Sequence, residues 1–173
     1  GKTTTTVNIA AALSMGGLRV LVIDLDPQGN ASTALGVPHR DTAGIYEVLM
    51  GDATIASVIQ KVAGFPALDC VPSNASLANA EVNLVSMVAR ELRLKEAVDE
   101  LNQVNPYDYI FIDCPPSLGL LTLAAHTPKN WKIIYKELDN FTEDDIINIL
   151  QEKPDIIAFS SLTPRIYETY QLS

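Results

Sequence analysis

Two continuous apolar runs that each end in an aspartate constrain the fold of this chain most strongly. Residues 19–24 read Arg-Val-Leu-Val-Ile-Asp, and residues 107–113 read Tyr-Asp-Tyr-Ile-Phe-Ile-Asp. Apolar runs of this kind are typical of strands that are buried on both faces of a parallel sheet. The sequence therefore predicts one buried strand in each of these two runs.

Segments with helical spacing separate the strands. The pattern predicts helices at residues 3–15, 42–50, 53–62 and 77–101, with a third short strand at residues 67–71. Strands that alternate with helices predict an α/β fold, in which a parallel sheet has right-handed crossovers and helices on both faces. We therefore expect a three-layer α/β/α architecture.

The same alternation continues in the last part of the chain. Residues 131–135 and 155–160 are predicted strands, and residues 142–151 and 166–172 are predicted helices. Neither a repeat nor a low-complexity segment interrupts the sequence, which is consistent with globular structure throughout.

The composition excludes several classes of protein. The chain has 173 residues, of which 47% are apolar and 19% are charged, and this is enough for a buried core. No apolar run approaches the roughly 18 residues that span a bilayer, so we expect a cytoplasmic protein without a membrane contact. Cys70 and Cys114 lie in apolar strand contexts, which favours buried free thiols. The net charge of −9 argues against binding DNA by bulk electrostatics.

The first four residues form a phosphate-binding pattern immediately before the first predicted helix: Gly1, Lys2, Thr3 and Thr4. A Gly-Lys-Thr step at a helix start offers backbone N–H groups, the positive end of the helix dipole, an ammonium group and a hydroxyl. We expect Lys2 to contact the β- and γ-phosphates of a nucleoside triphosphate and Thr3 to contact Mg²⁺. The same step also occurs at ordinary helix starts, so this motif alone leaves both interpretations open.

Three aspartates follow the carboxyl ends of the two buried strands. Asp24 and Asp113 close the strands, and Asp26 lies two residues beyond Asp24. Open α/β sheets bind their ligands at this edge. Asp113 is placed to hold a metal-bound water, and Asp26 could orient or deprotonate an attacking water. The alternative for each strand-terminal aspartate is an ordinary turn or cap residue.

Other polar side chains are predicted to be structural. Asp69 and Asp108 are expected to be surface turn residues, and His39 and His126 are expected to lie in loops. None of the four enters the predicted site.

Three segments carry a resemblance to a known family. They are residues 1–13 (Gly-Lys-Thr-Thr-Thr-Thr-Val-Asn-Ile-Ala-Ala-Ala-Leu), residues 20–32 (Val-Leu-Val-Ile-Asp-Leu-Asp-Pro-Gln-Gly-Asn-Ala-Ser) and residues 107–119 (Tyr-Asp-Tyr-Ile-Phe-Ile-Asp-Cys-Pro-Pro-Ser-Leu-Gly). Together these segments resemble the ParA/Soj chromosome and plasmid partition ATPases of the deviant Walker A (ParA/MinD) branch. The match covers residues 1–123. The aspartate-rich second segment is much more restrictive than a phosphate loop.

This resemblance implies a P-loop NTPase-like fold and a site that binds ATP and Mg²⁺. Gly1, Lys2, Thr3 and Thr4 would bind the phosphates, with Thr3 also at the metal. Lys2 and the hydrolysis-assisting Asp26 would be the catalytic residues. Members of the family are ATP-dependent homodimers that bind DNA nonspecifically and are stimulated by a ParB-type centromere-binding partner.

For the same family, Asp113 would be the Walker B carboxylate, and Asp24 would support the network on the metal side. Both aspartates would therefore serve Mg²⁺, together with Thr3.

The sequence departs from the family pattern in two places. The family has a strand and a Lys-Gly-Gly-Val loop half before the residue that corresponds to Gly1, so we expect the first strand to be missing. After residue 123 the pattern stops, and residues 124–173 resemble the N-terminal cobalamin-binding-like domain of some radical SAM enzymes. We therefore expect two parts, residues 1–123 and 124–173, with a fusion or frame junction near residues 123–127.

Three hypotheses about function follow. The first is a truncated partition protein that binds and hydrolyses ATP. The second is an inactive nucleotide-fold fragment, because half of the loop is missing. The third is a cobalamin-binding-like accessory domain, which follows from residues 124–173. Binding of ATP with Mg²⁺ separates the first two, and a spectral change on adding cobalamin tests the third.

Overall fold

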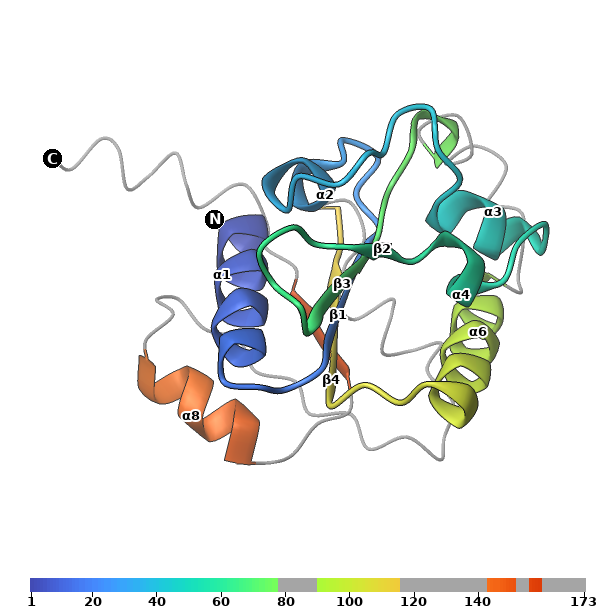
Figure 1. Cartoon of the computed structure of the whole chain (residues 1–173). Helices are drawn as coiled ribbons and strands as arrows, with labels where there is room; N and C mark the ends of the chain where they lie inside the picture. The colour runs from blue at the N-terminus through green and yellow to red at the C-terminus, as the bar shows by residue number, and fades with distance from the viewer. Residues whose placement is uncertain (78–89, 116–142, 152–155, 160–173) are drawn as a thin grey trace, which may run out of the picture.

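The computed structural model describes residues 1–77, 90–115, 143–151 and 156–159. Its helices in these ranges are α1 (Lys2–Met15), α2 (Asn30–Ala34), α3 (Ile45–Met50), α4 (Ile55–Val58), α6 (Arg90–Val104) and α8 (Glu143–Gln151). Its strands there are β1 (Val20–Asp24), β2 (Gln60–Lys61), β3 (Leu68–Val71), β4 (Tyr109–Asp113) and β5 (Ile156–Phe159). Figure 1 shows the strands between two groups of helices.

The strands form one sheet in the order β2-β3-β1-β4-β5. The strands β3, β1, β4 and β5 are parallel neighbours, and only the short β2 runs antiparallel to β3. The central strand β1 is buried along its whole length, as its unbroken Val-Leu-Val-Ile run predicts for a strand covered on both faces. The predicted α/β fold with a parallel sheet is confirmed.

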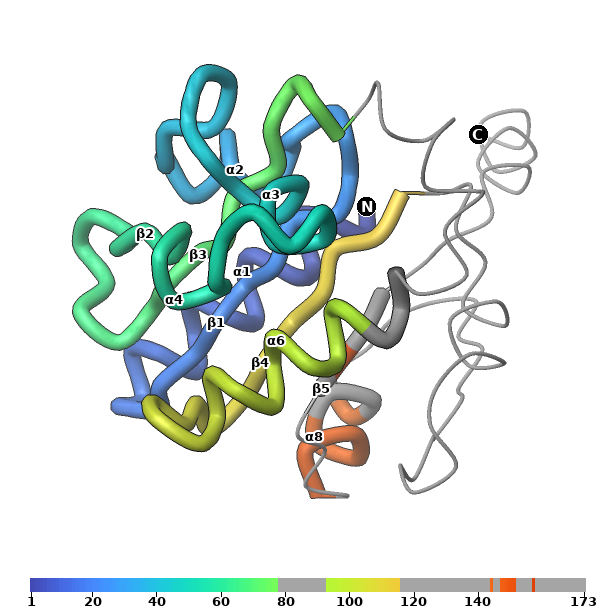
Figure 2. Tube along the Cα trace, turned by 90° about the vertical axis from the view of Figure 1, so that its right-hand side faces the viewer, coloured from blue at the N-terminus to red at the C-terminus, as the bar shows by residue number. Residues whose placement is uncertain are grey.

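Helices cover both faces of the sheet, and each face has its own apolar cluster. In Figure 1, α1 and α8 lie on one side of the strands, and α3, α4 and α6 lie on the other. Figure 2 looks onto the second side, where α3, α4 and α6 cross in front of β1 and β4. The three-layer architecture expected from the sequence is confirmed.

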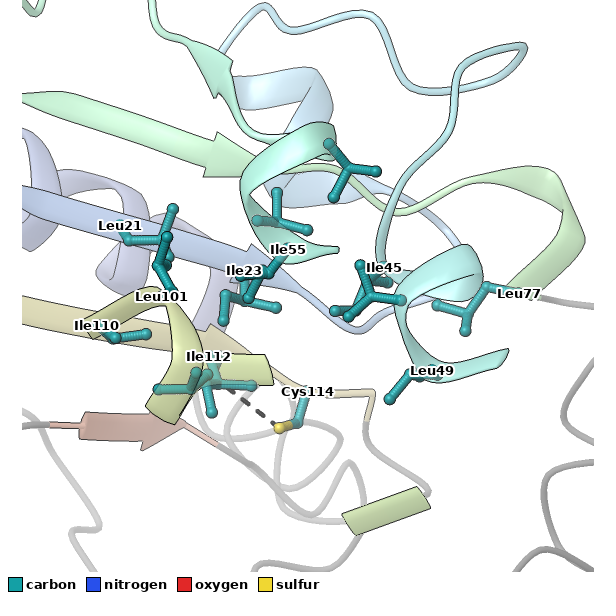
Figure 3. Packing of buried hydrophobic residues seen from close by; sticks show 14 residues of the cluster. Leu21, Ile23, Ile45, Leu49, Ile55, Leu77, Leu101, Ile110, Ile112 and Cys114 are labelled. Atoms are coloured by element: carbon teal, nitrogen blue, oxygen red, sulfur yellow. Dashed lines mark hydrogen bonds between the residues drawn. The ribbon is translucent and has the colours of Figure 1, made fainter. Parts of the chain in front are cut away.

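The alternation of side chains along β1 divides the core between these two faces. Leu21 and Ile23 point toward α3, α4 and α6, whereas Val20 and Val22 belong to the cluster beneath α1 and α2. Figure 3 shows Leu21 and Ile23 packed with Leu101 of α6 and with residues from α3 and α4. Burial of both faces fixes the register of the central strand, because a slip of one residue would exchange the two clusters.

Most predicted elements are confirmed, with boundaries that shift by a few residues. The helix predicted at residues 53–62 is confirmed only in its first half, as α4, and the prediction was wrong for the second half, where Gln60–Lys61 form strand β2. Lys61 Nζ donates to Asp69 Oδ2 of β3 over 2.8 Å, and this contact favours pairing over another helical turn. The short helix α2 was not predicted.

In the later part of the chain, the predicted helix at residues 142–151 and the strand at residues 155–160 are confirmed as α8 and β5. The elements predicted at residues 131–135 and 166–172 lie outside the described residues, as does the first half of the helix predicted at 77–101. The boundary predicted near residues 123–127 also lies there, so the division into two parts stays a prediction.

The predictions for the two cysteines are confirmed, whereas those for the four polar residues expected to be structural are confirmed only in part. Cys70 and Cys114 are buried free thiols, and burial raises the pKa of the Cys114 thiol to about 12. Asp108 is exposed, as expected. The prediction for Asp69 was wrong, because its side chain lies in β3, is only 3% exposed and accepts hydrogen bonds from Lys61 and Tyr107. His39 lies in a loop, and His126 is outside the described residues.

Candidate active site

The carboxyl ends of β1 and β4 lie side by side at one edge of the sheet. Asp24 and Asp113 are register partners, and the backbone N–H of Leu25 donates to the carbonyl oxygen of Asp113 over 2.8 Å. Two aspartates that are 89 residues apart in the sequence (24 and 113) are therefore brought to one place. This is the edge at which open parallel sheets bind ligands.

The start of α1 meets the same edge. Thr3 Oγ1 donates to Asp113 Oδ2 over 2.8 Å, and Lys2 Nζ donates to the carbonyl oxygen of Cys114 over 2.8 Å. The first helical hydrogen bond runs from Thr5 N to the carbonyl oxygen of Gly1, so the N–H groups of the residues between them have no acceptor within the helix. The backbone N–H groups of residues 1–4, here called the amide turn, thus lie beside the ammonium group of Lys2 and the carboxylate of Asp113.

Asp113 is the strongest candidate for binding a cation, because one of its carboxylate oxygens has no hydrogen-bond partner among the described residues. Its side chain is only 1% exposed, and Oδ1 is buried without a hydrogen-bond partner among the described residues. Burial raises the pKa of this carboxyl, Thr3 and Lys2 oppose the increase, and the nearby charge of Asp26 adds to it. An acceptor that is buried and unpaired costs free energy unless a proton donor or a cation satisfies it.

Asp24 is fully buried, and both of its carboxylate oxygens accept hydrogen bonds from the turn and helix that follow β1. Oδ2 accepts from both the backbone N–H and the hydroxyl of Ser32, over 2.8 and 2.7 Å, and Oδ1 accepts from the N–H of Asp26 over 3.1 Å. Burial nevertheless raises the pKa of Asp24 to about 6, because these hydrogen bonds only partly compensate for lost hydration. The carboxylate shapes the turn that follows β1.

Asp26 lies in that turn and is 8% exposed. Its Oδ1 accepts from the N–H of Gln28 over 3.0 Å, and its carbonyl oxygen accepts from the N–H of Gly29 over 2.9 Å. Gly29 has a φ of +63°, which favours glycine, and it closes the turn just before α2 begins. The turn therefore holds the Asp26 carboxylate near Asp113.

Of the remaining predicted residues, Gly1 and Thr4 are exposed. Thr4 lies on the first turn of α1, where only its backbone N–H is part of the amide turn. Lys2, Thr3, Asp26 and Asp113 are the residues that the fold gathers most closely.

Comparisons with known proteins agree with this arrangement. Residues 1–158 match the family model described as an AAA domain. Soj of Bacillus subtilis (strain 168), a sporulation initiation inhibitor protein, is 42% identical over 151 residues, which cover 87% of this chain and 58% of Soj. The chromosome partitioning protein ParA of Caulobacter vibrioides is 38% identical over 168 residues, which cover 96% of this chain and 61% of ParA. This chain belongs to the ParA/MinD family.

Among solved structures, cobyrinic acid a,c-diamide synthase from Mycobacterium smegmatis, with bound ADP and magnesium, is similar to this ParA/MinD-family chain. The TM-score is 0.60 and the identity 41%, over 70% of this chain and 49% of the synthase. The P-loop NTPase-like fold predicted from the sequence is confirmed. The chain spans 58–61% of the length of the curated relatives named above.

The contacts around Thr3 and Asp113 fit a Mg²⁺ ion that arrives with a nucleotide. Among the residues that the structure describes, no group of three or more His, Cys, Asp or Glu side chains is placed to hold a metal. Mg²⁺ commonly takes only one or two carboxylates from a protein and completes its shell with phosphates and waters. The unpaired Oδ1 of Asp113 and the adjacent Thr3 hydroxyl suit that mode of binding.

One neighbour of this ParA/MinD-family site, Ser32, was missed by sequence reasoning. Ser32 Oγ donates to Asp24 and also accepts from the N–H of Ser73 over 3.1 Å. Ser32 thereby joins the turn after β1 to the segment after β3. The only sequence signal was a hydroxyl within the small residues that follow Gly29, and such a residue is equally common at plain helix starts.

No helix in the described part of the chain combines the length and the apolar character needed to cross a membrane.

Proposed function

We propose that this chain binds ATP together with Mg²⁺ at the edge formed by α1, β1 and β4, and that it hydrolyses ATP as part of a partition-type protein. The observation that carries the proposal is the hydrogen bond from Thr3 Oγ1 to Asp113 Oδ2. It joins the amide turn at residues 1–4 to the strand-terminal carboxylate. The names of the relatives support the partition role, and the ADP and magnesium bound to the M. smegmatis synthase support the ligands.

In this proposal, the backbone N–H groups at the start of α1 and the ammonium group of Lys2 bind the phosphates. Lys2 Nζ now donates to the Cys114 carbonyl oxygen, which keeps the cation at the same edge as Asp113. When bound, Mg²⁺ supplies neutralisation of the phosphate charge that develops during transfer. Thr3 and Asp113 would hold that ion.

Asp26 is the proposed residue for orienting or deprotonating the attacking water. Its carboxylate is fixed by the N–H of Gln28, and it lies near enough to Asp113 for its charge to raise the pKa of that group. Asp24 is proposed to support the metal side by holding the turn through Ser32 and the Asp26 N–H. Phosphoryl transfer relies mainly on positioning and on charge, which suits this set of groups.

The cellular role that we propose is chromosome or plasmid segregation in the cytoplasm. By analogy with the family, the protein would form a homodimer on binding ATP and would respond to a ParB-type centromere-binding protein. Nonspecific DNA binding, which the family also implies, receives no support from the net charge of −9 in this chain.

Isothermal titration calorimetry with ATP and Mg²⁺ tests the proposal. The wild-type chain should bind, and Lys2→Ala should abolish detectable binding, because the substitution removes the ammonium group that lies at the amide turn and at the same sheet edge as Asp113. Arg40→Ala is the matched control, since it removes an exposed cation from a loop and should leave binding unchanged. Absence of binding to the wild-type chain would contradict the proposal and would favour an inactive nucleotide-fold module.

A further inference from the structure

A histidine outside the motifs of the predicted site packs against the turn that carries Asp26. His39 lies in the loop between α2 and α3 and is half-buried. Its ring rests on Gly29, because a Cβ atom built on Gly29 would lie 2.8 Å from His39 Nδ1 and 2.9 Å from Cε1. The ring therefore occupies the space that any other residue at position 29 would need.

A hydrogen bond holds the ring in that place. His39 Nε2 lies 3.0 Å from Thr33 Oγ1, and Thr33 belongs to α2. In the part of the loop that precedes His39, Leu35 and Val37 are buried in the apolar cluster beneath α1 and α2. The backbone before His39 is thus anchored by the core, and the ring itself is directed toward the turn.

Gly29 connects the ring to Asp26. The N–H of Gly29 donates to the carbonyl oxygen of Asp26 over 2.9 Å, and the carbonyl oxygen of Gly29 accepts from the N–H of Thr33 over 2.9 Å. A displacement of Gly29 would therefore be transmitted to Asp26 through one backbone hydrogen bond. The left-handed conformation of Gly29 makes the position costly to rebuild with another residue.

We propose that His39 is a positioning residue, whose ring and bond to Thr33 brace the turn at residues 26–29 and so hold the Asp26 carboxylate in place. The consequence for catalysis rests on the proposed ATP hydrolysis. The bracing of the turn does not depend on ATP hydrolysis, because it is defined by contacts among His39, Gly29 and Thr33.

Amide hydrogen exchange measured by NMR tests the brace without reference to ATP. In His39→Ala, the N–H groups of Gln28 and Gly29 should exchange about tenfold faster than in the wild type, because local opening of the turn becomes easier. The melting temperature should change little, since the ring is at the edge of the core. Thr33→Val should have a smaller effect of the same sign, and His39→Gln, which retains a polar nitrogen that can reach Thr33, should recover part of the protection.

Steady-state ATP hydrolysis tests the catalytic consequence. His39→Ala should lower kcat by about tenfold and leave KM unchanged, because a misplaced general base affects turnover more than binding. His39→Gln should recover part of kcat. Ser57→Ala, which removes an exposed hydroxyl on the distant α4, is the control.

The outcomes separate the two proposals. Unchanged exchange at Gln28 and Gly29 in His39→Ala would overturn the brace, and faster exchange with an unchanged kcat would overturn its role in positioning Asp26. A wild-type protein that does not hydrolyse ATP would refute the proposed function, while faster exchange in the variant would still support the brace.

Discussion

At the scale of single residues, the site combines carboxylates that have different surroundings. Asp24 is saturated with hydrogen bonds, whereas Asp113 keeps one buried oxygen unpaired among the described residues. This difference suits a division of roles in which Asp24 shapes the turn and Asp113 serves the ligand. Burial raises the pKa of both groups.

The raised pKa of Asp24 predicts a specific dependence of stability on pH. The group has a pKa of about 6 in the folded chain and an ordinary value of 3.8, so the folded chain binds more protons between these values. The free energy of unfolding should therefore fall as the pH rises from about 4 to about 6, by up to about 3 kcal/mol from this group. Below about pH 4, the Asp24 carboxyl is protonated in the folded chain, so its burial carries no free-energy cost from a buried charge.

Urea denaturation over this pH range, compared between the wild type and Asp24→Asn, measures the effect. The variant should lose most of the dependence, because its side chain does not titrate. The account of Asp24 would be contradicted if the two proteins gave parallel curves between pH 4 and pH 6.

At the scale of elements, the segment after β3 is joined closely to the start of α3. The N–H of Ile45 donates to the Pro72 carbonyl oxygen over 2.9 Å, and a Cβ atom built on Gly44 would lie 2.2 Å from that oxygen. Glu47 Oε2 also accepts from the N–H of Gly44 and from Asn74 Nδ2. The close approach of two backbones explains why a residue without a side chain precedes α3.

Gly44→Ala should therefore destabilise the protein by about 2–4 kcal/mol, since the Pro72 backbone must move to admit a methyl group. Urea denaturation measures the loss. Gly16→Ala is the control, because Gly16 has an ordinary negative φ and its nearest contact for a new Cβ atom is 3.2 Å away. An equal decrease in the free energy of unfolding of the two variants would contradict the prediction that the close contact with Pro72 makes Gly44→Ala more destabilising.

The sequence predicted the elements that have a local apolar or helical pattern, and it missed the features that depend on contacts with distant segments of the chain. The strand at residues 19–24 and the helix at residues 3–15 follow from local apolar runs and helical spacing, and both are confirmed. Strand β2 has only two residues, and it pairs with Asp69 and Cys70 of β3, which are distant from the local pattern of residues 53–62. The contact of His39 with Gly29 joins residues whose relation depends on how the loop after α2 folds back, and no periodicity encodes it.

At the scale of the whole molecule, the parallel sheet gathers residues from distant segments at one edge. The predicted residues Thr3, Asp24 and Asp113 meet at this edge. Asp24 and Asp113 end the paired strands β1 and β4, and Thr3 lies at the start of α1, which packs beside these strands. The catalytic, phosphate-binding and metal-binding roles of these residues stay predictions. Their proximity was predictable, since the carboxyl ends of parallel strands share an edge.

The negative net charge of the chain predicts weak binding to DNA. With a net charge of −9, this chain should show no binding to duplex DNA of random sequence by fluorescence anisotropy at physiological salt. A basic DNA-binding domain of similar size is the positive control. Binding that weakens steeply as salt increases would reveal a local basic surface and would contradict the prediction.

In the function that we propose, Asp26 acts in turnover at a site where Lys2, Thr3 and Asp113 meet a Mg²⁺-bound ATP. The most direct measurement compares ATP binding and ATP hydrolysis in the wild type and in Asp26→Ala. We predict that the variant binds ATP with unchanged affinity and has lost hydrolysis, because the residue that orients or deprotonates the water is absent. Hydrolysis at the wild-type rate in Asp26→Ala would contradict the account.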